Sequence, residues 1–330
     1  MSAQSSIAGA SPTTGSSTRP AEVGASLAAN IAPEVTAFAR EVGDSDPVTV
    51  VGARTHTRVG GESAAGTREV RAPAGVWEHE PSEMTVRCGA GTPVGELAAH
   101  LAHRGQMVPL DPADDAATVG GVLACGFSGH RRLRYGHVRD LVLQTRHVDA
   151  AGKVVTAGGP TVKNVSGYDL PRLLVGSLGT LGCLAEVILR TLPVPPAAQW
   201  LVGAGDPFAA FDLLYRPSSV LWDSTRTWIL LEGDPSDIAA ETAKVEPLGF
   251  GPADGGPSIP GTGRESMKPS ELRALAGTPG GWIAEVGVGL VHRPESVAAG
   301  TVVPTNAALM TELKRKLDPA GRLNPGRSAW

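Results

Sequence analysis

The pattern of apolar and polar residues predicts alternating short strands and helices along the chain. Apolar residues recur at helical spacing between Pro20 and Val42, and because Pro33 lies inside this run, one broken helix or two short helices are expected. Runs rich in β-branched residues predict strands, and runs of helix formers between them predict helices. The strands are expected at 47–52, 84–88, 138–148, 154–156, 183–192, 200–202, 219–222, 227–232 and 282–291, and the other helices at 94–103, 118–124, 168–174, 207–214, 236–245 and 307–317.

The run Pro193-Val194-Pro195-Pro196 is the strongest linker signal in the chain. The elements predicted after it follow the order strand, helix, strand, strand, helix, and the glycine clusters of the preceding part stop there. This order is typical of a small α+β domain with an antiparallel sheet. A chain of 330 residues is also long for one compact core, so two domains, or one domain with an insertion, are expected.

Composition and charge exclude several classes of protein. The formal net charge of −4 gives no support for a nucleic-acid partner. Cys88, Cys125 and Cys183 stand far apart and in no C-x-x-C spacing, which predicts neither a zinc nor an iron–sulfur site and fits a reduced, cytoplasmic protein. No run approaches the roughly 20 apolar residues of a membrane helix, so no direct membrane span is expected. The first twenty residues, rich in Ser, Thr, Gly and Ala, predict a disordered tail.

Two glycine clusters flank an arginine cluster between Asp111 and Leu192. Glycine lets backbone amides approach a ligand closely, so this pattern favours a site for a large phosphorylated molecule. The loop 53–61 follows a predicted strand and could present amides to a pyrophosphate, although a solvated surface turn would show the same residues. The segment 89–95 differs by one residue from the dinucleotide-binding fingerprint and lacks the acidic residue that should follow. It is therefore interpreted as a plain strand-to-helix turn.

Five segments in a fixed order carry a resemblance to a known family. They are Thr118–Gly121, Ser128–Asp140, Lys163–Leu170, Gly176–Gly182 and Leu317–Arg327. Together they resemble the FAD-binding subunit of glycolate oxidase, within the FAD-binding group typified by p-cresol methylhydroxylase (PCMH) and vanillyl-alcohol oxidase. The resemblance implies an α+β fold with a two-lobed, PCMH-type FAD-binding domain, a small α+β cap domain and a C-terminal segment that returns to the FAD domain. The expected division is a tail at 1–20, the FAD domain at 21–193, the cap at 197–304 and the C-terminal helix and tail at 305–330.

The resemblance also implies FAD as the cofactor and suggests where it is held. The early loop would hold the pyrophosphate, the Thr118 segment would lie near the flavin, and the segment 176–182 would pass the phosphates and ribose. Non-covalent FAD is expected, with His56 as a hydrogen-bond donor, although some relatives in the wider group attach FAD through a histidine in this loop. The implied contacts are Gly52, Ala53, Arg54, Thr55, His56, Thr118, Gly120, Gly121, Gly126, Ser128, Gly129, Gly176, Ser177, Gly179, Thr180, Gly182 and Asn324.

Three consecutive residues are weak candidates for catalysis. Arg131 and Arg132 could place positive charge beside the flavin or hold a substrate carboxylate, and the alternative is a solvated or subunit-contacting loop. His130 stands where the family commonly has proline, and it could act as a base or be incidental. The cap lacks the His-Gly-x-Gly-Asn-x-His-like metal motif of catalytic relatives, and His292 is the only histidine after residue 147. No metal site is therefore predicted, and no base in the cap can be named.

The implied reaction is oxidation of glycolate or D-lactate to the 2-oxo acid, with hydride transfer to the flavin. Because this chain has no cysteine ligand set, the electrons are expected to leave through an iron–sulfur partner subunit. A heteromeric complex with a paralogous FAD catalytic subunit is expected. The alternative is a non-catalytic or electron-relay FAD subunit whose paralogous partner performs the oxidation. The predicted location is cytoplasmic, or peripheral at the inner face of the membrane through partners.

Overall fold

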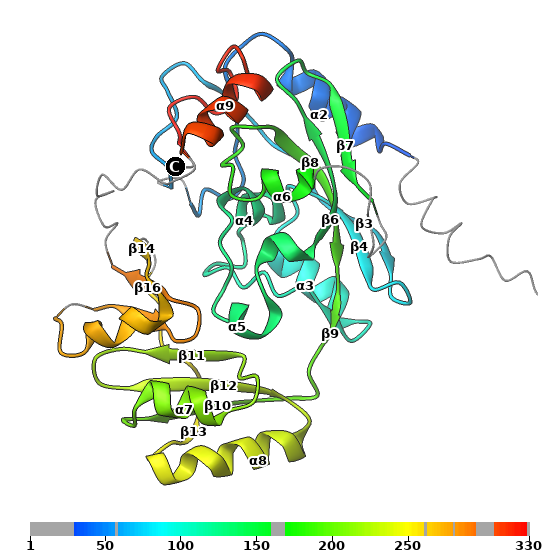
Figure 1. Cartoon of the computed structure of the whole chain (residues 1–330). Helices are drawn as coiled ribbons and strands as arrows, with labels where there is room; N and C mark the ends of the chain where they lie inside the picture. The colour runs from blue at the N-terminus through cyan, green and yellow to red at the C-terminus, as the bar shows by residue number, and fades with distance from the viewer. Residues whose placement is uncertain are drawn as a thin grey trace, which may run out of the picture.

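The computed structural model describes residues 30–56, 59–159, 169–260, 263–279, 281–294 and 307–328. The predicted tail at 1–20, positions 57–58 of the early loop and positions 163–168 of the motif string lie outside these residues. Within them, the chain forms two lobes (Figure 1). We call the lobe formed by residues up to 193 and from 307 onward the main lobe, and the lobe formed by residues 197–294 the cap. No helix in this described part of the chain is long and apolar enough to cross a membrane.

A five-stranded antiparallel sheet organises the main lobe, in the order β3-β4-β8-β6-β7. Its strands are β3 (Val76–Glu80), β4 (Thr85–Gly89), β8 (Cys183–Arg190), β6 (Val142–Val148) and β7 (Val154–Gly158). The central strand β8 is buried along nearly its whole length, because both faces of the sheet are covered, and its sequence is accordingly almost continuously apolar. Strand β6 begins later than predicted, since Val138–Leu141 forms a 3-10 turn, η1, ahead of it.

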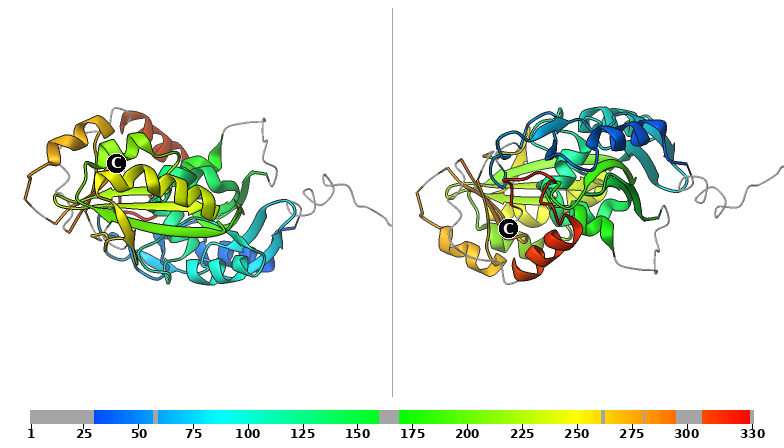
Figure 2. Two further views of the ribbon diagram at one scale, coloured as in Figure 1. Left: turned by 90° about the horizontal axis from the view of Figure 1, so that it is seen from below. Right: turned by 90° about the horizontal axis from the view of Figure 1, so that it is seen from above.

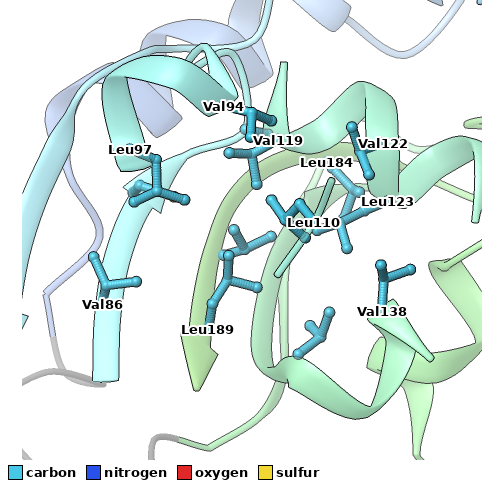
Figure 3. Close-up of a cluster of buried hydrophobic side chains, with 14 of the residues drawn as sticks. Val86, Val94, Leu97, Leu110, Val119, Val122, Leu123, Val138, Leu184 and Leu189 are labelled. Atoms are coloured by element: carbon cyan, nitrogen blue, oxygen red, sulfur yellow. The ribbon is translucent and has the colours of Figure 1, made fainter. Parts of the chain in front are cut away.

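Helices α3 (Val94–Ala102) and α4 (Val119–Cys125) pack on one face of this sheet and build its hydrophobic core. Figure 3 shows their apolar side chains gathered with Leu184 and Leu189 of β8. Helix α4 begins where the sequence predicted, because Thr118 is its N-cap and accepts a hydrogen bond from the Gly121 amide at 3.1 Å. Two shorter helices, α5 (Arg132–Tyr135) and α6 (Leu170–Leu174), complete this part of the lobe.

Helix α2 (Pro33–Val42) covers the opposite face of the sheet. Its buried Val35 and Phe38 join a second cluster that includes Ala185 of β8, whose side chain points away from that of Leu184. The predicted helical run from Pro20 is described only from residue 30, so the expected broken helix or pair of short helices stays a prediction. Pro33 occupies the first turn of α2, where an amide N–H has no intrahelical partner to lose. Strands β1 (Val48–Val50) and β2 (Arg68–Val70) form a parallel pair beside this layer.

The predicted linker is partly a strand. Leu192–Pro193, β9, pairs antiparallel with Gln106–Met107, β5. The chain then enters the first cap strand at Ala197. The chain therefore passes from the main lobe into the cap through residues 194–196.

The cap contains a seven-stranded sheet in the order β13-β10-β12-β11-β15-β16-β14, and every neighbouring pair is antiparallel. The strands are β10 (Ala197–Gly203), β11 (Ser219–Trp222), β12 (Thr227–Gly233), β13 (Gly251–Ala253), β14 (Gly263–Ser266), β15 (Ile283–Glu285) and β16 (Leu290–Arg293). The single strand predicted at 282–291 is wrong, because β15 and β16 form a hairpin there. Gly287 and Gly289 have φ of 83° and 83°, which suits a turn that side-chain-bearing residues rarely adopt.

The two faces of the cap sheet have different coverings. Helices α7 (Pro207–Leu213) and α8 (Pro235–Val245) lie on one face with the 3-10 helices η2 (Glu246–Leu248) and η3 (Pro269–Leu275). There they form a core with apolar strand residues such as Leu201 and Ile229. Trp200 and Leu230 alternate with these residues and therefore point to the other face. That face lies against the main lobe (Figure 1, Figure 2).

The last described segment returns to the main lobe. Helix α9 (Ala307–Leu317) is followed by a tail that runs beside β1, where the Asn324 amide donates to the Val48 carbonyl at 2.7 Å. Lys314 Nζ donates to the Thr180 carbonyl at 2.8 Å. In the parts of the chain that the structure describes, no strand of one lobe pairs with a strand of the other. The division at 21–193, 197–304 and 305–330 remains a proposal that this separation supports.

Candidate functional site

Two adjoining pockets open in the main lobe between α4, the loop after β1 and the segment before β8. They share a wall of Val50, Val51, Gly52, Thr118, Gly121, Ala124 and Leu178. The first pocket is further lined by Ala72, Ala90, Gly91, Gly120, Ser177, Gly179, Gly182, Cys183 and Leu184, and the second by Ala53, Arg54, Thr55, His56, Cys125, Asn324 and Arg327. Most of the predicted cofactor contacts are therefore brought together here.

The loop after β1 offers backbone donors to the second pocket. Among the described residues, no amide from Gly52 to His56 donates a hydrogen bond to a protein group. Other contacts hold the loop: Arg71 Nη1 donates to the Gly52 carbonyl at 3.1 Å, and Arg54 pairs with Glu69 at 2.5 Å. The charge of Arg54 is thus already balanced. The row of free amides is the feature of this loop that suits a pyrophosphate.

Close packing explains why residue 52 is glycine. A Cβ at this position would lie 2.4 Å from Thr118 Oγ1, the atom that caps α4. No side chain fits that gap, so glycine allows the loop to pass over the start of the helix. This crossing joins the walls of the two pockets.

A second close approach involves two glycines that line neither pocket. A Cβ on Gly126 would lie 2.9 Å from the Gly176 Cα, and both glycines have positive φ. They were predicted to touch the cofactor, but in the structure they let the end of α4 pass directly against the segment before β8. Their contact with FAD stays a prediction.

Three further predicted contacts also lie away from the pocket walls. A Cβ on Gly129 would lie 2.1 Å from the Asp111 Cβ, so this glycine is required for packing. Ser128 Oγ accepts a hydrogen bond from the Val138 amide at 3.1 Å. Thr180 Oγ1 donates to a backbone carbonyl within its own turn at 2.7 Å. The hydroxyl groups are thus engaged within the protein.

Asn324 fastens the C-terminal tail to the wall of the second pocket. Its Oδ1 accepts from Thr49 Oγ1 at 2.7 Å and from Ser63 Oγ at 3.1 Å, and its Nδ2 donates to the Leu178 carbonyl at 2.5 Å. Asn324, Leu178 and Arg54 all line this pocket and have φ of 47°, 53° and 60°. Residues other than glycine rarely adopt such values, and strained backbone of this kind gathers at ligand sites.

These features fit FAD. Its phosphates need donors, which the free amides of the second pocket supply, while its rings need apolar walls such as those that Ala72 and Leu184 give the first pocket. His56 Nδ1 lies 2.9 Å from Thr55 Oγ1, and its ring packs edge-on against Phe127 with centroids 5.4 Å apart. Non-covalent attachment of FAD stays a prediction.

Arg131 joins the two lobes through ion pairs. Its guanidinium contacts Asp111 at 2.5 Å within the main lobe and Glu232 of β12 at 3.1 Å in the cap. Burial alone would lower the pKa of Arg131, but the hydrogen bonds and charges of the two carboxylates raise it above its ordinary value. Tyr135 adds a hydrogen bond to Glu232 at 3.0 Å. Arg131 thus takes part in a contact between the two lobes.

His130 and Arg132, the neighbours of Arg131, have different surroundings. The His130 ring packs against Trp200 of the cap with centroids 5.6 Å apart, and its Nδ1 is buried without a hydrogen-bond partner in the described chain. Burial lowers the pKa of His130, so the ring is neutral at neutral pH. The side chain of Arg132 makes no hydrogen bond or ion pair with any described residue.

The cap brings three polar residues to this boundary that sequence reasoning did not select. Arg264 of β14 lies opposite His292 of β16 in the sheet register, so both side chains share one face. The guanidinium of Arg264 stacks on Phe127 of the main lobe at 4.2 Å and donates to the Ser128 carbonyl at 3.1 Å. His292 Nε2 lies 2.6 Å from Glu285 Oε1, and Glu285 Oε2 is buried without a partner among the described residues.

Local sequence signals existed for some of the missed residues only. Leu178 and Arg327 lie inside motif segments already assigned to the site, so those segments pointed to them. Gly91 lines the first pocket although its motif was interpreted as a plain turn. No local sequence pattern pointed to Arg264 or Glu285, because only the packing of the cap against the main lobe gives them a role.

Comparisons with known proteins agree with this geometry. A family profile described as an FAD binding domain matches residues 25–158. Over 334 residues the chain is 32% identical to the glycolate oxidase subunit GlcE of Escherichia coli (strain K12), and the alignment covers 87% of this chain and 93% of that protein. Over 106 residues it is 42% identical to a D-lactate dehydrogenase of Archaeoglobus fulgidus, covering 32% of this chain and 24% of that protein.

The solved structure of an alkyldihydroxyacetonephosphate synthase shares the fold, with a TM-score of 0.63 at 16% identity, covering 88% of this chain and 73% of the other. At that identity the likeness concerns the fold alone. The alignment to a glycolate oxidase subunit, by contrast, extends over nearly the whole of both chains. The chain therefore belongs to the family of glycolate oxidase FAD subunits, FAD-dependent oxidoreductases with a PCMH-type FAD-binding domain.

Proposed function

We propose that this chain binds FAD in the two joined pockets and oxidises a small 2-hydroxy acid, glycolate or D-lactate, to the 2-oxo acid. The observation that carries the proposal is the row of unengaged amides from Gly52 to His56 beside an apolar pocket. Oxidation removes a hydride from the substrate carbon and a proton from its hydroxyl group. Bound FAD supplies the two-electron acceptor for that hydride.

The proton needs an acceptor, and the pair formed by His292 and Glu285 is the proposed one. A carboxylate 2.6 Å from one imidazole nitrogen fixes the tautomer of the ring and stabilises the charge that appears when the other nitrogen takes a proton. His292 lies beside Arg264, which reaches the main lobe next to residues of the second pocket. His130 is the second candidate, because it is neutral and lies at the same boundary.

The proposed assembly is a heteromeric complex. This chain contains three cysteines, Cys88, Cys125 and Cys183, which stand far apart in the sequence and in no spacing typical of an iron–sulfur ligand set. Electrons from the substrate therefore pass to an iron–sulfur partner subunit, with a paralogous FAD subunit in the same complex. The name of the Escherichia coli relative, a glycolate oxidase subunit, supports this arrangement. We place the complex in the cytoplasm or, through its partners, at the inner face of the membrane.

Anaerobic spectroscopy of the purified chain tests the proposal. We expect a flavin spectrum, release of the flavin by acid, and bleaching when glycolate or D-lactate is added. His292→Asn should slow bleaching by about 10²-fold or more, because general base catalysis contributes roughly that much. His130→Asn removes the imidazole of the second candidate and is the matched comparison. A protein without flavin would refute the proposal. Flavin that stays oxidised with both substrates, alone and with the partner subunits, would instead assign the non-catalytic role to this chain.

A further inference from the structure

Arg264 holds a largely buried positive charge at the boundary of the lobes without an acidic partner. Its guanidinium is 4.2 Å from the centre of the Phe127 ring, and its one hydrogen bond goes to the Ser128 carbonyl. In the described chain it makes no ion pair, although Glu285 lies near enough to influence its charge. Since a guanidinium has five N–H donors, most of its donor capacity is unused. An unpaired buried cation is costly unless an anion completes it.

Arg132 supplies a second positive charge close to the first. The Arg132 amide donates to the Gly129 carbonyl at 3.1 Å, and Gly129 follows Ser128, whose carbonyl accepts from Arg264, so both arginines meet the same short segment of the main lobe. Burial lowers the pKa of Arg264, Glu285 raises it, and Arg132 lowers it further, in keeping with this placement. Burial, followed by Arg132, Arg139 and Arg264, lowers the pKa of His137 to about 4. His137 is therefore uncharged at neutral pH. The positive charge of this region resides on the arginines.

Several other arginines at the lobe boundary or stacked on a ring have partners. Arg131 pairs with two carboxylates, and Arg134 donates to the Glu232 carbonyl at 2.5 Å. Arg273 stacks on Phe208 at 4.0 Å, much as Arg264 stacks on Phe127, but it also pairs with Asp206 at 3.5 Å. Arg226 of the cap stacks on Trp228 at 5.8 Å and also makes no ion pair with a described residue, but it is exposed to solvent. Arg264 differs from Arg226 because it is partly buried, and from Arg273 because it has no carboxylate partner.

We propose that Arg264 and Arg132 form the site that binds the carboxylate of the 2-hydroxy acid substrate. The inference rests on the proposed oxidation and adds to it the residues that recognise the acid. Arginine suits this role because its planar fork of donors matches a carboxylate. An FAD phosphate is the other anion with the required chemistry. The substrate is favoured because Arg264 comes from the cap, whereas the free amides that suit phosphate belong to the main-lobe loop.

Binding of oxalate to the full-length protein with FAD bound tests this site. Oxalate resembles the 2-oxo acid product, and its binding can be followed by the shift of the flavin absorbance and by titration calorimetry. Arg264→Gln and Arg132→Gln should each weaken oxalate binding at least tenfold without changing the FAD content of the purified protein. Arg264→Lys, which keeps the charge, should weaken oxalate binding less than Arg264→Gln does. Arg273→Gln is the matched control and should bind oxalate like the unchanged protein.

The outcomes separate this inference from the oxidation itself. Oxalate affinity within twofold of the unchanged protein in both glutamine variants would overturn the carboxylate site, even if glycolate still bleaches the flavin. Loss of FAD from Arg264→Gln would overturn it too, because the arginine would then serve the cofactor phosphate. Weakened oxalate binding with FAD retained supports the site, whether or not the unchanged protein is reduced by glycolate.

Discussion

At the scale of single residues, chemically identical side chains have opposite surroundings in this protein. Arg131 is paired with Asp111 and Glu232, whereas the next residue, Arg132, has no partner in the described chain. Histidines differ in the same way. His147 is 7% exposed and its Nδ1 has no hydrogen-bond partner among the described residues, while His103 lies exposed at the end of α3. The tertiary surroundings, not the residue type, therefore distinguish these side chains.

His147 should make the protein sensitive to acid. Burial lowers its pKa to about 4, below the unfolded value of about 6.5, so the unfolded chain takes up the proton first as pH falls. The stability that neutral His147 contributes is therefore complete above about pH 6.5 and is lost as pH falls toward 4. At pH 5 the expected decrease in the free energy of unfolding that comes from His147 is about 2 kcal/mol. Urea unfolding at pH 7 and pH 5 measures it.

Two variants isolate this effect. His147→Gln should reduce the loss of stability between pH 7 and pH 5, because the titrating group is gone. His103→Gln should leave the loss unchanged. An equal loss in all three proteins would show that His147 is not responsible.

At the scale of elements, the central strand β8 holds its two neighbours by a buried charge cluster. Glu186 of β8 is fully buried and bonds Arg87 of β4 at 2.8 Å and Arg146 of β6 at 2.7 Å. Both arginines also donate to the Asn30 carbonyl, at 2.8 and 2.9 Å. One carboxylate thus compensates two guanidinium groups on both sides of the strand. The cluster favours one register of the sheet, because a slip by one residue would turn Glu186 to the other face.

Glu186→Gln should destabilise the main lobe strongly. It removes the carboxylate that Arg87 and Arg146 share and leaves Arg87 with the more distant Glu78 at 3.8 Å, and breaking a buried ion pair in this way costs about 3–5 kcal/mol. Glu69→Gln is the control, since Glu69 pairs with Arg54 at 2.5 Å on the surface, where such pairs contribute about 1 kcal/mol or less. Urea unfolding of both variants at pH 7 gives the comparison. Equal losses of unfolding free energy in Glu186→Gln and Glu69→Gln would contradict a special role for the cluster.

At the scale of the whole molecule, the cap is joined to the main lobe by polar contacts and a short connection. Glu232 is central to this junction: its side chain accepts from Arg131 Nη1 at 3.1 Å and from Tyr135 at 3.0 Å, and its carbonyl accepts from Arg134. Trp200 adds a ring contact to His130. Arg264 meets the main lobe from β14 at the other end of the same sheet, so the Glu232 contacts and the proposed substrate site lie along one cap face.

Glu232→Ala should loosen the cap without unfolding either lobe. The variant removes two hydrogen bonds that involve a charged group, which contribute about 1.5–3 kcal/mol each, while Arg131 keeps Asp111 as a partner. Limited proteolysis in the connection at 194–196 should become several-fold faster. Glu265→Ala is the control, because Glu265 pairs with Arg293 inside the cap at 2.9 Å. Cleavage at the same rate in all three proteins would exclude Glu232 as the junction.

Several features followed from local sequence alone. Thr118 caps α4, and Pro207 and Pro235 begin α7 and α8, because caps and helix starts depend on a few neighbouring residues. Most of the glycine-rich motif residues line the two pockets, since backbone that must approach a ligand needs glycine wherever it lies in the fold. Pro33 shows the limit of such signals, because proline is equally suited to breaking a helix and to beginning one.

The sequence by itself thus determined most of the helices, the family and many of the segments that form the pockets, whereas short strands such as β2, β3 and β5 were not predicted. Only the tertiary structure decided which charged residues meet. Arg131 and Glu232 are separated by 101 positions, and Arg264 reaches Ser128 across 136. No local pattern predicts such a contact, because it depends on how two separately built sheets pack. The β15–β16 hairpin, by contrast, brings His292 to Glu285 within the cap. The packing of the lobes left Arg132 and Arg264 as cations without acidic partners in the described chain.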